Sequence, residues 1–193
     1  MMKTLKLAAA AVVMMSGMAS AQDFGTGMGG WSGFYGGVQA EKLMGGSKKS
    51  GASDTRATGK AFGLHGGYLQ DMDGFVLGGE LAYDKLKDVK YRGASMDGSM
   101  IRAKAIAGYD MGQFLPYATL GAERLTLENA AAQGGDIKAN GLVYGLGVKM
   151  KATEQILVGA ELLKHDYKDI NKSEPGKQKL DSTTLGVNVS YRF

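Results

Sequence analysis

The chain contains no cysteine and only two prolines among its 193 residues. Without cysteine there are no disulfides, so an exported form must be stabilised by hydrogen bonds and packing. No segment approaches the roughly 20 consecutive apolar residues that a membrane-spanning helix needs. Glycine is abundant, at 31 residues, but it occurs without proline or low-complexity repeats, so it does not indicate disorder. These absences exclude a disulfide-stapled domain and a helical membrane protein.

The first 21 residues have the pattern of a secretory signal. Lys3 and Lys6 precede an apolar run, 7–15, and the small residues Ala19 and Ala21 follow it. This order predicts a signal peptide, 1–21, that is cleaved after Ala21. The next segment, QDFGTGMGG at 22–30, is expected to be a flexible lead. The remaining 31–193 fit one domain by length.

The charge balance argues against nucleic acid as a partner. Cleavage of the signal removes two lysines and leaves 21 basic against 19 acidic residues, so the net charge falls from +4 to +2. A nucleic-acid-binding domain ordinarily carries a pronounced basic surface.

Eight segments of the mature chain alternate with period two, which is typical of β-strands. The expected strands are Trp31–Leu43, Thr58–Gln70, Gly74–Leu86, Ser99–Asp110, Phe114–Leu127, Ile137–Met150, Ile156–His165 and Leu180–Phe193.

The connections between these segments alternate in length. Short turns are expected at 71–74, 111–113 and 151–155, and longer polar loops at 44–57, 87–97, 128–136 and 166–179. Three tight turns at one end and four loops at the other predict an all-β fold, an eight-stranded antiparallel up-and-down transmembrane β-barrel. Outer-membrane barrels have this layout, with short periplasmic turns and long external loops.

Each strand has one apolar and one polar face, a pattern that also fits a soluble lipocalin-like barrel turned the other way out. The positions of the glycines decide between these two orientations. The interior of an eight-stranded barrel is narrow, so long charged side chains fit there only if neighbouring inward positions are glycine. Eleven glycines share the polar face and therefore place it inside: Gly37, Gly63, Gly67, Gly78, Gly108, Gly121, Gly141, Gly145, Gly147, Gly159 and Gly186.

Seven aromatic residues fall at the tight-turn ends of their strands. Rings favour the boundary between lipid and water, so these residues predict a periplasmic aromatic girdle. The alternative is that aromatic residues are simply common in strands. The seven are Phe34, Tyr68, Phe75, Tyr109, Phe114, Tyr191 and Phe193.

Four sequence segments carry a family resemblance: WSGFYGGVQA, LPYATLGAE, GAELLKHDY and the ending LGVNVSYRF. They resemble the small porin-family outer-membrane β-barrel proteins typical of alphaproteobacteria, which are related in fold to OmpA-like transmembrane domains. The resemblance covers the mature chain and implies an abundant surface protein in the cell outer membrane. It also implies that Tyr191 and Phe193 belong to a C-terminal signal that the barrel-assembly machinery reads.

The candidates for catalysis and for metal or cofactor binding are few. His65 is expected to pack in the interior, and His165 to be a surface or rim residue. Some eight-stranded barrels are lipid A deacylases with a serine two residues after the histidine, but Tyr167 occupies that position here. Neither a metal site nor a cofactor is predicted. Lys48, Lys49 and Arg56 form either a contact for lipopolysaccharide phosphates or a solvated loop.

Four inward charges form the most consequential group. Pairing of the third, fourth and fifth strands brings Glu80, Arg102, Lys104 and Glu123 together, with Arg102 between the two carboxylates. In a filled tube such charges must be paired, so a structural role is favoured over ion transport.

The expected function is that of a structural surface barrel that contributes to envelope integrity and surface or host interaction. Its predicted partners are outer-membrane lipid, lipopolysaccharide, the barrel-assembly machinery and a host or surface ligand at the loops. A narrow diffusion channel and an outer-membrane lipid-modifying enzyme remain as alternatives.

Overall fold

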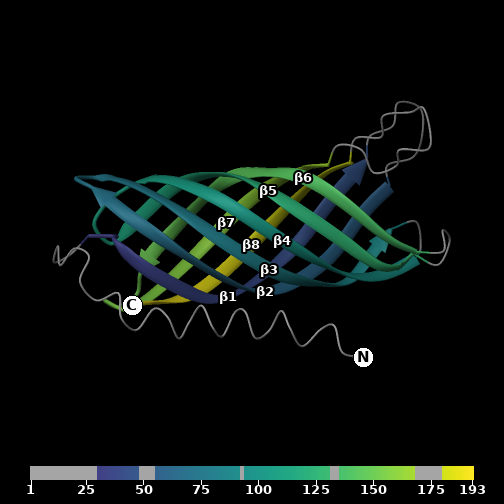
Figure 1. Cartoon of the computed structure of the whole chain (residues 1–193), viewed down its shortest axis with the longest axis horizontal. Helices are drawn as coiled ribbons and strands as arrows, with labels where there is room; N and C mark the ends of the chain where they lie inside the picture. The colour runs from purple at the N-terminus through teal and green to yellow at the C-terminus, as the bar shows by residue number, and fades with distance from the viewer. Residues whose placement is uncertain (1–29, 48–54, 92–93, 131–134, 168–179) are drawn as a thin grey trace.

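The computed structural model describes residues 30–47, 55–91, 94–130, 135–167 and 180–193. Eight antiparallel strands pair in sequence order, and β8 pairs with β1, so the sheet closes into a barrel (Figure 1). The predicted all-β up-and-down barrel is therefore confirmed. The strands are β1 (Gly33–Ser47), β2 (Thr55–Met72), β3 (Phe75–Tyr91), β4 (Ala94–Tyr109), β5 (Phe114–Ala130), β6 (Gly135–Lys151), β7 (Ile156–Tyr167) and β8 (Leu180–Arg192).

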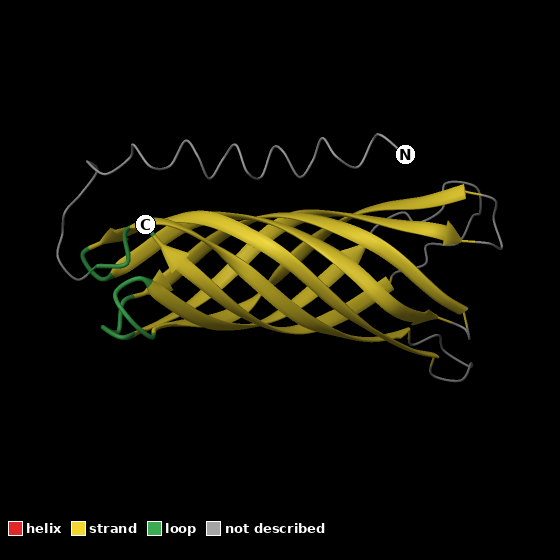
Figure 2. Ribbon diagram, turned by 90° about the horizontal axis from the view of Figure 1, so that it is seen from below, coloured by secondary structure: helices red, strands yellow, loops and turns green. Residues whose placement is uncertain are grey.

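Three short turns lie together at one end of the barrel, called the turn end below, where β1 also begins and β8 ends (Figure 2). The tightest joins β2 to β3 through Asp73 and Gly74, whose φ angles are 57° and 105°. Two-residue hairpin turns require positive φ, and an Asp-Gly pair supplies it at low cost. The Asp71 carboxylate accepts a hydrogen bond from the Gly74 N–H at 3.2 Å and braces this turn.

The strands extend further than expected at the opposite end, called the distal end. The loop expected at 87–97 is mostly strand, because β3 continues to Tyr91 and β4 starts at Ala94. The prediction ended each strand where apolar alternation stops, but backbone pairing does not depend on apolar side chains. At the turn end, β1 begins at Gly33 rather than at Trp31.

The two faces of the wall differ as predicted, with the polar face inside. On β3, outward Leu81 is 54% exposed, whereas its neighbour Glu80 is 4% exposed. The same alternation follows all eight strands, so the outer wall is apolar at mid-height and the lumen is lined by buried polar side chains. This arrangement excludes the lipocalin-like alternative. No helix in the described part of the chain is long and apolar enough to cross a membrane.

Inward glycines make room for large side chains, as their placement in the sequence suggests. A Cβ added at Gly147 would overlap the ring of Tyr117, and one at Gly67 would meet the Tyr35 ring at 2.8 Å. Because protein interiors are close-packed, a methyl group at either position would force an aromatic ring to move.

Candidate functional site in the lumen and wall

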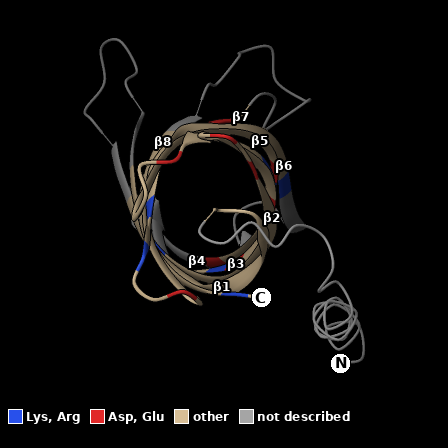
Figure 3. Cartoon of the chain, turned by 90° about the vertical axis from the view of Figure 1, so that its left-hand side faces the viewer, with Lys and Arg blue, Asp and Glu red and all other residues tan. Residues whose placement is uncertain are grey.

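The inward side chains form successive layers, which β3 and β4 display in order. From the turn end, β3 presents Val76, Glu80, Asp84 and Leu86 to the lumen, and β4 presents Ile106, Lys104, Arg102 and Met100. Two apolar layers thus enclose two charged layers inside a ring of eight strands, which Figure 3 shows from the turn end.

The layer at the turn end is a cluster of large apolar residues, called the apolar base. Its members come from six strands and the segment before β1, and all are buried: Trp31, Tyr35, Leu69, Val76, Ile106, Leu115, Tyr117 and Leu157. A smaller cluster lies toward the distal end and comprises Ala61, Leu86 and Met100, with Leu43 and Leu125 packed against it.

Trp31 fixes the chain across the mouth at the turn end and has no exposed surface. Its indole N–H donates to Asp110 at 3.0 Å, and its backbone N–H donates to Asp71 at 3.1 Å. The Lys151 ammonium lies 4.5 Å from the centre of the indole ring, a cation–π distance. Arg192 donates to the carbonyl of Gly30 at 2.7 Å, so the last strand also holds this segment.

The first charged layer is the lower cluster, made of Glu80, Lys104, Lys149 and Glu161. The Lys104 ammonium contacts Glu80 at 2.7 Å and Glu161 at 2.8 Å, and Lys149 contacts Glu80 at 3.3 Å. With two cations and two carboxylates, this buried cluster is formally neutral. Two tyrosines of the apolar base complete its hydrogen bonds, since Tyr35 donates to Glu80 at 2.7 Å and Tyr117 to Glu161 at 2.8 Å.

The second charged layer is the upper cluster, centred on Arg102. The Nη2 atom of Arg102 donates to Asp84 at 2.7 Å and to Glu41 at 2.5 Å, and its Nη1 atom donates to Glu41 at 3.1 Å. Arg102 therefore lies between two carboxylates, but these are not the expected Glu80 and Glu123. The long guanidinium reaches across the narrow lumen to β1, a contact that pairing of neighbouring strands cannot predict.

Glu123 instead binds His165, with 2.8 Å between a carboxylate oxygen and Nδ1. The other ring nitrogen of His165 lies 3.0 Å from the Thr184 hydroxyl, and Tyr167 stacks on the imidazole. All four side chains are buried. The expectation that His165 is a surface or rim residue is therefore wrong, because it occupies an inward position of β7.

His65 packs in the interior as expected, with Nε2 at 2.7 Å from the Ser190 hydroxyl. Its Nδ1 has no hydrogen-bond partner among the described residues, so no carboxylate orients the ring. Nucleophilic catalysis needs such an orienting group. Within the described ranges, no three histidine, cysteine or acidic residues are grouped as a metal site would require.

The seven girdle residues all lie at the turn end and face outward. They pair across strands: Phe34 with Tyr68 at 4.7 Å between ring centres, and Phe75 with Tyr109 at 5.6 Å. Tyr191 and Phe193 make a third pair at 5.2 Å, and Phe114 is exposed on β5. The Phe75–Tyr109 and Tyr191–Phe193 pairs are edge-on and the Phe34–Tyr68 pair is tilted, and edge-on contacts stabilise aromatic pairs.

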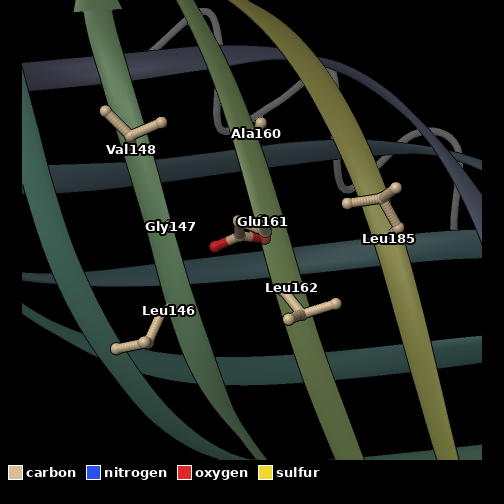
Figure 4. Close-up of a pocket in the computed structure, with 7 residues that line it drawn as sticks. All are labelled: Leu146, Gly147, Val148, Ala160, Glu161, Leu162 and Leu185. Atoms are coloured by element: carbon tan, nitrogen blue, oxygen red, sulfur yellow. The ribbon is translucent and has the colours of Figure 1, made fainter.

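A shallow apolar hollow of about 290 Å³ interrupts the outer wall across β6, β7 and β8 (Figure 4). It exists because Ala160 is small and stands among larger outward neighbours. Glu161 is also among the lining residues, although its carboxylate binds Lys104 in the lumen. The apolar neighbours are Leu146, Val148, Leu162 and Leu185.

Three predicted features lie wholly or partly outside the described residues. These are the signal peptide with most of the lead, 1–29, the side chains of Lys48, Lys49 and Arg56, and parts of the four expected loops, at 48–54, 92–93, 131–134 and 168–179, to which Ser50 and Glu174 belong.

The class of protein follows from the closed barrel with its apolar outer wall and charged lumen. The chain belongs to the family of the outer membrane protein beta-barrel domain, whose profile matches residues 7–193. It is accordingly an outer-membrane barrel. No sequence among curated proteins matches the chain.

Solved structures of similar shape are small barrels from Gram-negative bacteria. Neisserial surface protein A is 22% identical, with a TM-score of 0.60, and the match covers 84% of this chain and 98% of that one. The N-terminal barrel domain of Pseudomonas aeruginosa OprF is 19% identical, with a TM-score of 0.52 and coverages of 81% and 97%. Ail, the attachment invasion locus protein of Yersinia pestis, is 16% identical, with a TM-score of 0.51 and coverages of 84% and 99%. At these identities the likeness shows the fold alone.

Proposed function

We propose that this protein is a structural, non-enzymatic barrel of the outer membrane. It contributes to envelope integrity, and its distal end meets envelope lipids and host or surface molecules. The observation that carries this proposal is the filled lumen, in which charge clusters are paired and enclosed by apolar layers. Such a lumen leaves the outer wall and the connections between strands as the surfaces available for function.

A narrow diffusion channel is the second candidate. It is favoured by the upper cluster, in which one guanidinium faces two carboxylates and so leaves a formal negative charge in the lumen. An enzymatic role has less support. Thr184, His165 and Glu123 follow the hydroxyl–imidazole–carboxylate order of a catalytic triad, but all three side chains are buried, which keeps them from contact with a substrate in solution.

The orientation in the proposal is tested by epitope tags on intact cells. A tag inserted at Ser50 or Glu174 should be accessible to antibody, whereas a tag at Asp73, in the turn between β2 and β3, should become accessible only after the outer membrane is permeabilised. Insertions are best tolerated in the connections between strands, so the tags should leave the pairing of the barrel strands intact. The opposite labelling pattern would reverse the proposed orientation.

Phe193 is proposed to act as part of an assembly signal. Its ring is 55% exposed and its backbone N–H donates to the Phe34 carbonyl at 3.0 Å, a bond that alanine keeps. Phe193→Ala should therefore lower outer-membrane insertion in cells severalfold while changing refolding in detergent little, because surface substitutions usually alter stability by no more than about 0.5 kcal/mol.

Phe75→Ala is the matched control for this prediction, because Phe75 is 65% exposed at the same end of the barrel but lies far from the C-terminus. Insertion is measured by quantifying folded protein in outer-membrane fractions. If both variants insert equally well, or if Phe193→Ala fails equally in detergent, Phe193 has only a packing role.

A further inference from the structure

The outward face changes from apolar to charged at a common height toward the distal end. The boundary falls between Ala40 and Lys42 on β1, and between Phe62 and Lys60 on β2. On β5 the outward residues from 114 to 122 precede Arg124. Nine residues in a strand tilted by about 40° rise roughly 23 Å, close to the apolar band of an outer-membrane barrel. The charged side chains therefore lie at one surface of the membrane.

Three of these cations, Lys42, Lys60 and Lys87, stand side by side and are called the lysine row. Lys42 is the cross-strand partner of Lys60, and Lys60 is the partner of Lys87. All three side chains are exposed on the outer wall. Neighbouring strands are about 4.8 Å apart, and like charges directly opposite each other destabilise a sheet.

The lysine row makes no ion pair and no side-chain hydrogen bond within the described part of the chain. Two acidic residues lie near its β3 end, since Asp88 follows Lys87 directly and the bulge of β3 places Asp97 of β4 opposite them. Lys85 lies on the same outward face, two residues nearer the turn end and opposite Phe62, and adds a fourth positive charge, so basic residues still outnumber acidic ones here. A local excess of cations without protein partners calls for an anion from outside.

The position of the lysine row identifies the chemistry of that anion. On β1 and β2, Ala40 and Phe62 are the outward residues next to the row toward the turn end, and both belong to the apolar band, so the ligand meets a lipid-facing wall beside its charges. A lipid satisfies both conditions with acyl chains on the wall and phosphate at the membrane surface. The row spans two strand spacings, about 10 Å, and this matches a headgroup with more than one phosphate better than a single phosphate.

We propose that the lysine row is a binding site for the phosphate groups of lipopolysaccharide in the outer leaflet. This proposal names a lipid partner for the surface barrel and rests on the orientation given under Proposed function. Phosphates that approach Lys42, Lys60 and Lys87 relieve their mutual repulsion, so the bound lipid also stabilises pairing of β1, β2 and β3.

Three other outward cations provide a matched control. Arg124, Lys138 and Lys164 lie near the same boundary, but their described cross-strand partners are uncharged. Arg124 donates to the Asn140 side chain at 2.9 Å. Replacing these three removes the same charge from the wall as replacing the lysine row, but it leaves the directly opposed lysines in place.

The test measures binding to the purified, folded protein in neutral detergent. Lipopolysaccharide affinity is compared for the wild type, the row variant (Lys42→Gln, Lys60→Gln, Lys87→Gln) and the control variant (Arg124→Gln, Lys138→Gln, Lys164→Gln). Each basic residue that contacts a lipid phosphate contributes on the order of 1 kcal/mol, so the row variant should bind at least about tenfold more weakly. The control cations are not cross-strand partners of one another and do not form such a site, so the control variant should bind within about threefold of wild type. Chemically dephosphorylated lipopolysaccharide should bind all three proteins alike.

Thermal unfolding gives a second readout. Lipopolysaccharide should raise the melting temperature of the wild type more than that of the row variant, which should itself be no less stable than wild type without lipid. Equal losses in the row and control variants, or an equal row effect with phosphatidylglycerol micelles or inorganic phosphate, would overturn the proposal. Because the assay uses isolated protein, reversed tag labelling in cells would contradict the proposed function without altering these affinities.

Discussion

Arg102→Ala is expected to lower the free energy of unfolding by about 3–5 kcal/mol, the usual cost of breaking a buried ion pair from one side. The substitution leaves Glu41 and Asp84 buried without the cation that now lies between them. Gln39 still donates to Asp84 at 2.6 Å, but a neutral amide cannot balance two carboxylates. The loss therefore comes from uncompensated charge more than from the missing side-chain volume.

The measurement is denaturant unfolding of the barrel refolded into lipid vesicles, monitored by the fluorescence of Trp31, the only tryptophan. Arg124→Ala is the control, because Arg124 is exposed on the outer wall and should change stability by less than about 1 kcal/mol. Adding Glu41→Gln and Asp84→Asn to Arg102→Ala should recover part of the loss by removing the repulsion. A midpoint that does not move in Arg102→Ala would mean that the upper cluster contributes no stability.

The sequence predicts which way each side chain faces but not which inward charges meet. Side chains alternate between the two faces of a strand with a fixed period of two. Once the strands are assigned correctly, this period alone places four charges in the lumen: Glu80, Arg102, Lys104 and Glu123. Their partners depend on the tilt of the strands and on the reach of long side chains across the tube. Glu41 and Asp84 could be assigned to the polar face, yet nothing local indicates that Arg102 on β4 contacts Glu41 on β1.

Lys149 and Glu161 show a second limit. Both occupy inward positions, on β6 and β7. The alternation of inward and outward residues along these strands is therefore enough to place both charges in the lumen. Their roles in the lower cluster depend on a contact between Lys104 and Glu161 that crosses the lumen from β4 to β7. Such pairs form across the lumen only because the barrel is closed. The register of neighbouring strands therefore does not predict them.

The alternation of apolar and polar residues also fails to predict the apolar base, but for a different reason. At the turn end, Leu69, Val76 and Leu115 point inward although they are apolar, so both faces of these strand ends are apolar and the alternation disappears. A short apolar run does not reveal which face is which. The sequence pattern likewise predicts that Trp31 starts a strand. In the structure Trp31 precedes β1 and covers the mouth of the barrel.

Trp31→Ala is expected to lower the stability of the folded barrel by about 3–5 kcal/mol, as for other large-to-small changes of a buried tryptophan. The variant loses the packing of the indole in the apolar base, its hydrogen bond to Asp110 and its contact with Lys151. Trp31→Phe keeps most of the volume and loses the indole N–H, so it should cost less, about 1–2 kcal/mol. Circular dichroism or the gel shift on boiling must follow unfolding here, because these variants contain no tryptophan.

The same variant separates the closed barrel from the channel alternative. Beneath Trp31, Tyr35 and Tyr117 still bind the lower cluster, so the lumen stays filled when the indole is removed. An eight-stranded barrel is only wide enough for its side chains. In planar bilayers we therefore expect few currents from wild type and little increase from Trp31→Ala, despite its lower stability. Large, steady currents that appear only in Trp31→Ala would instead identify Trp31 as the gate of a narrow channel.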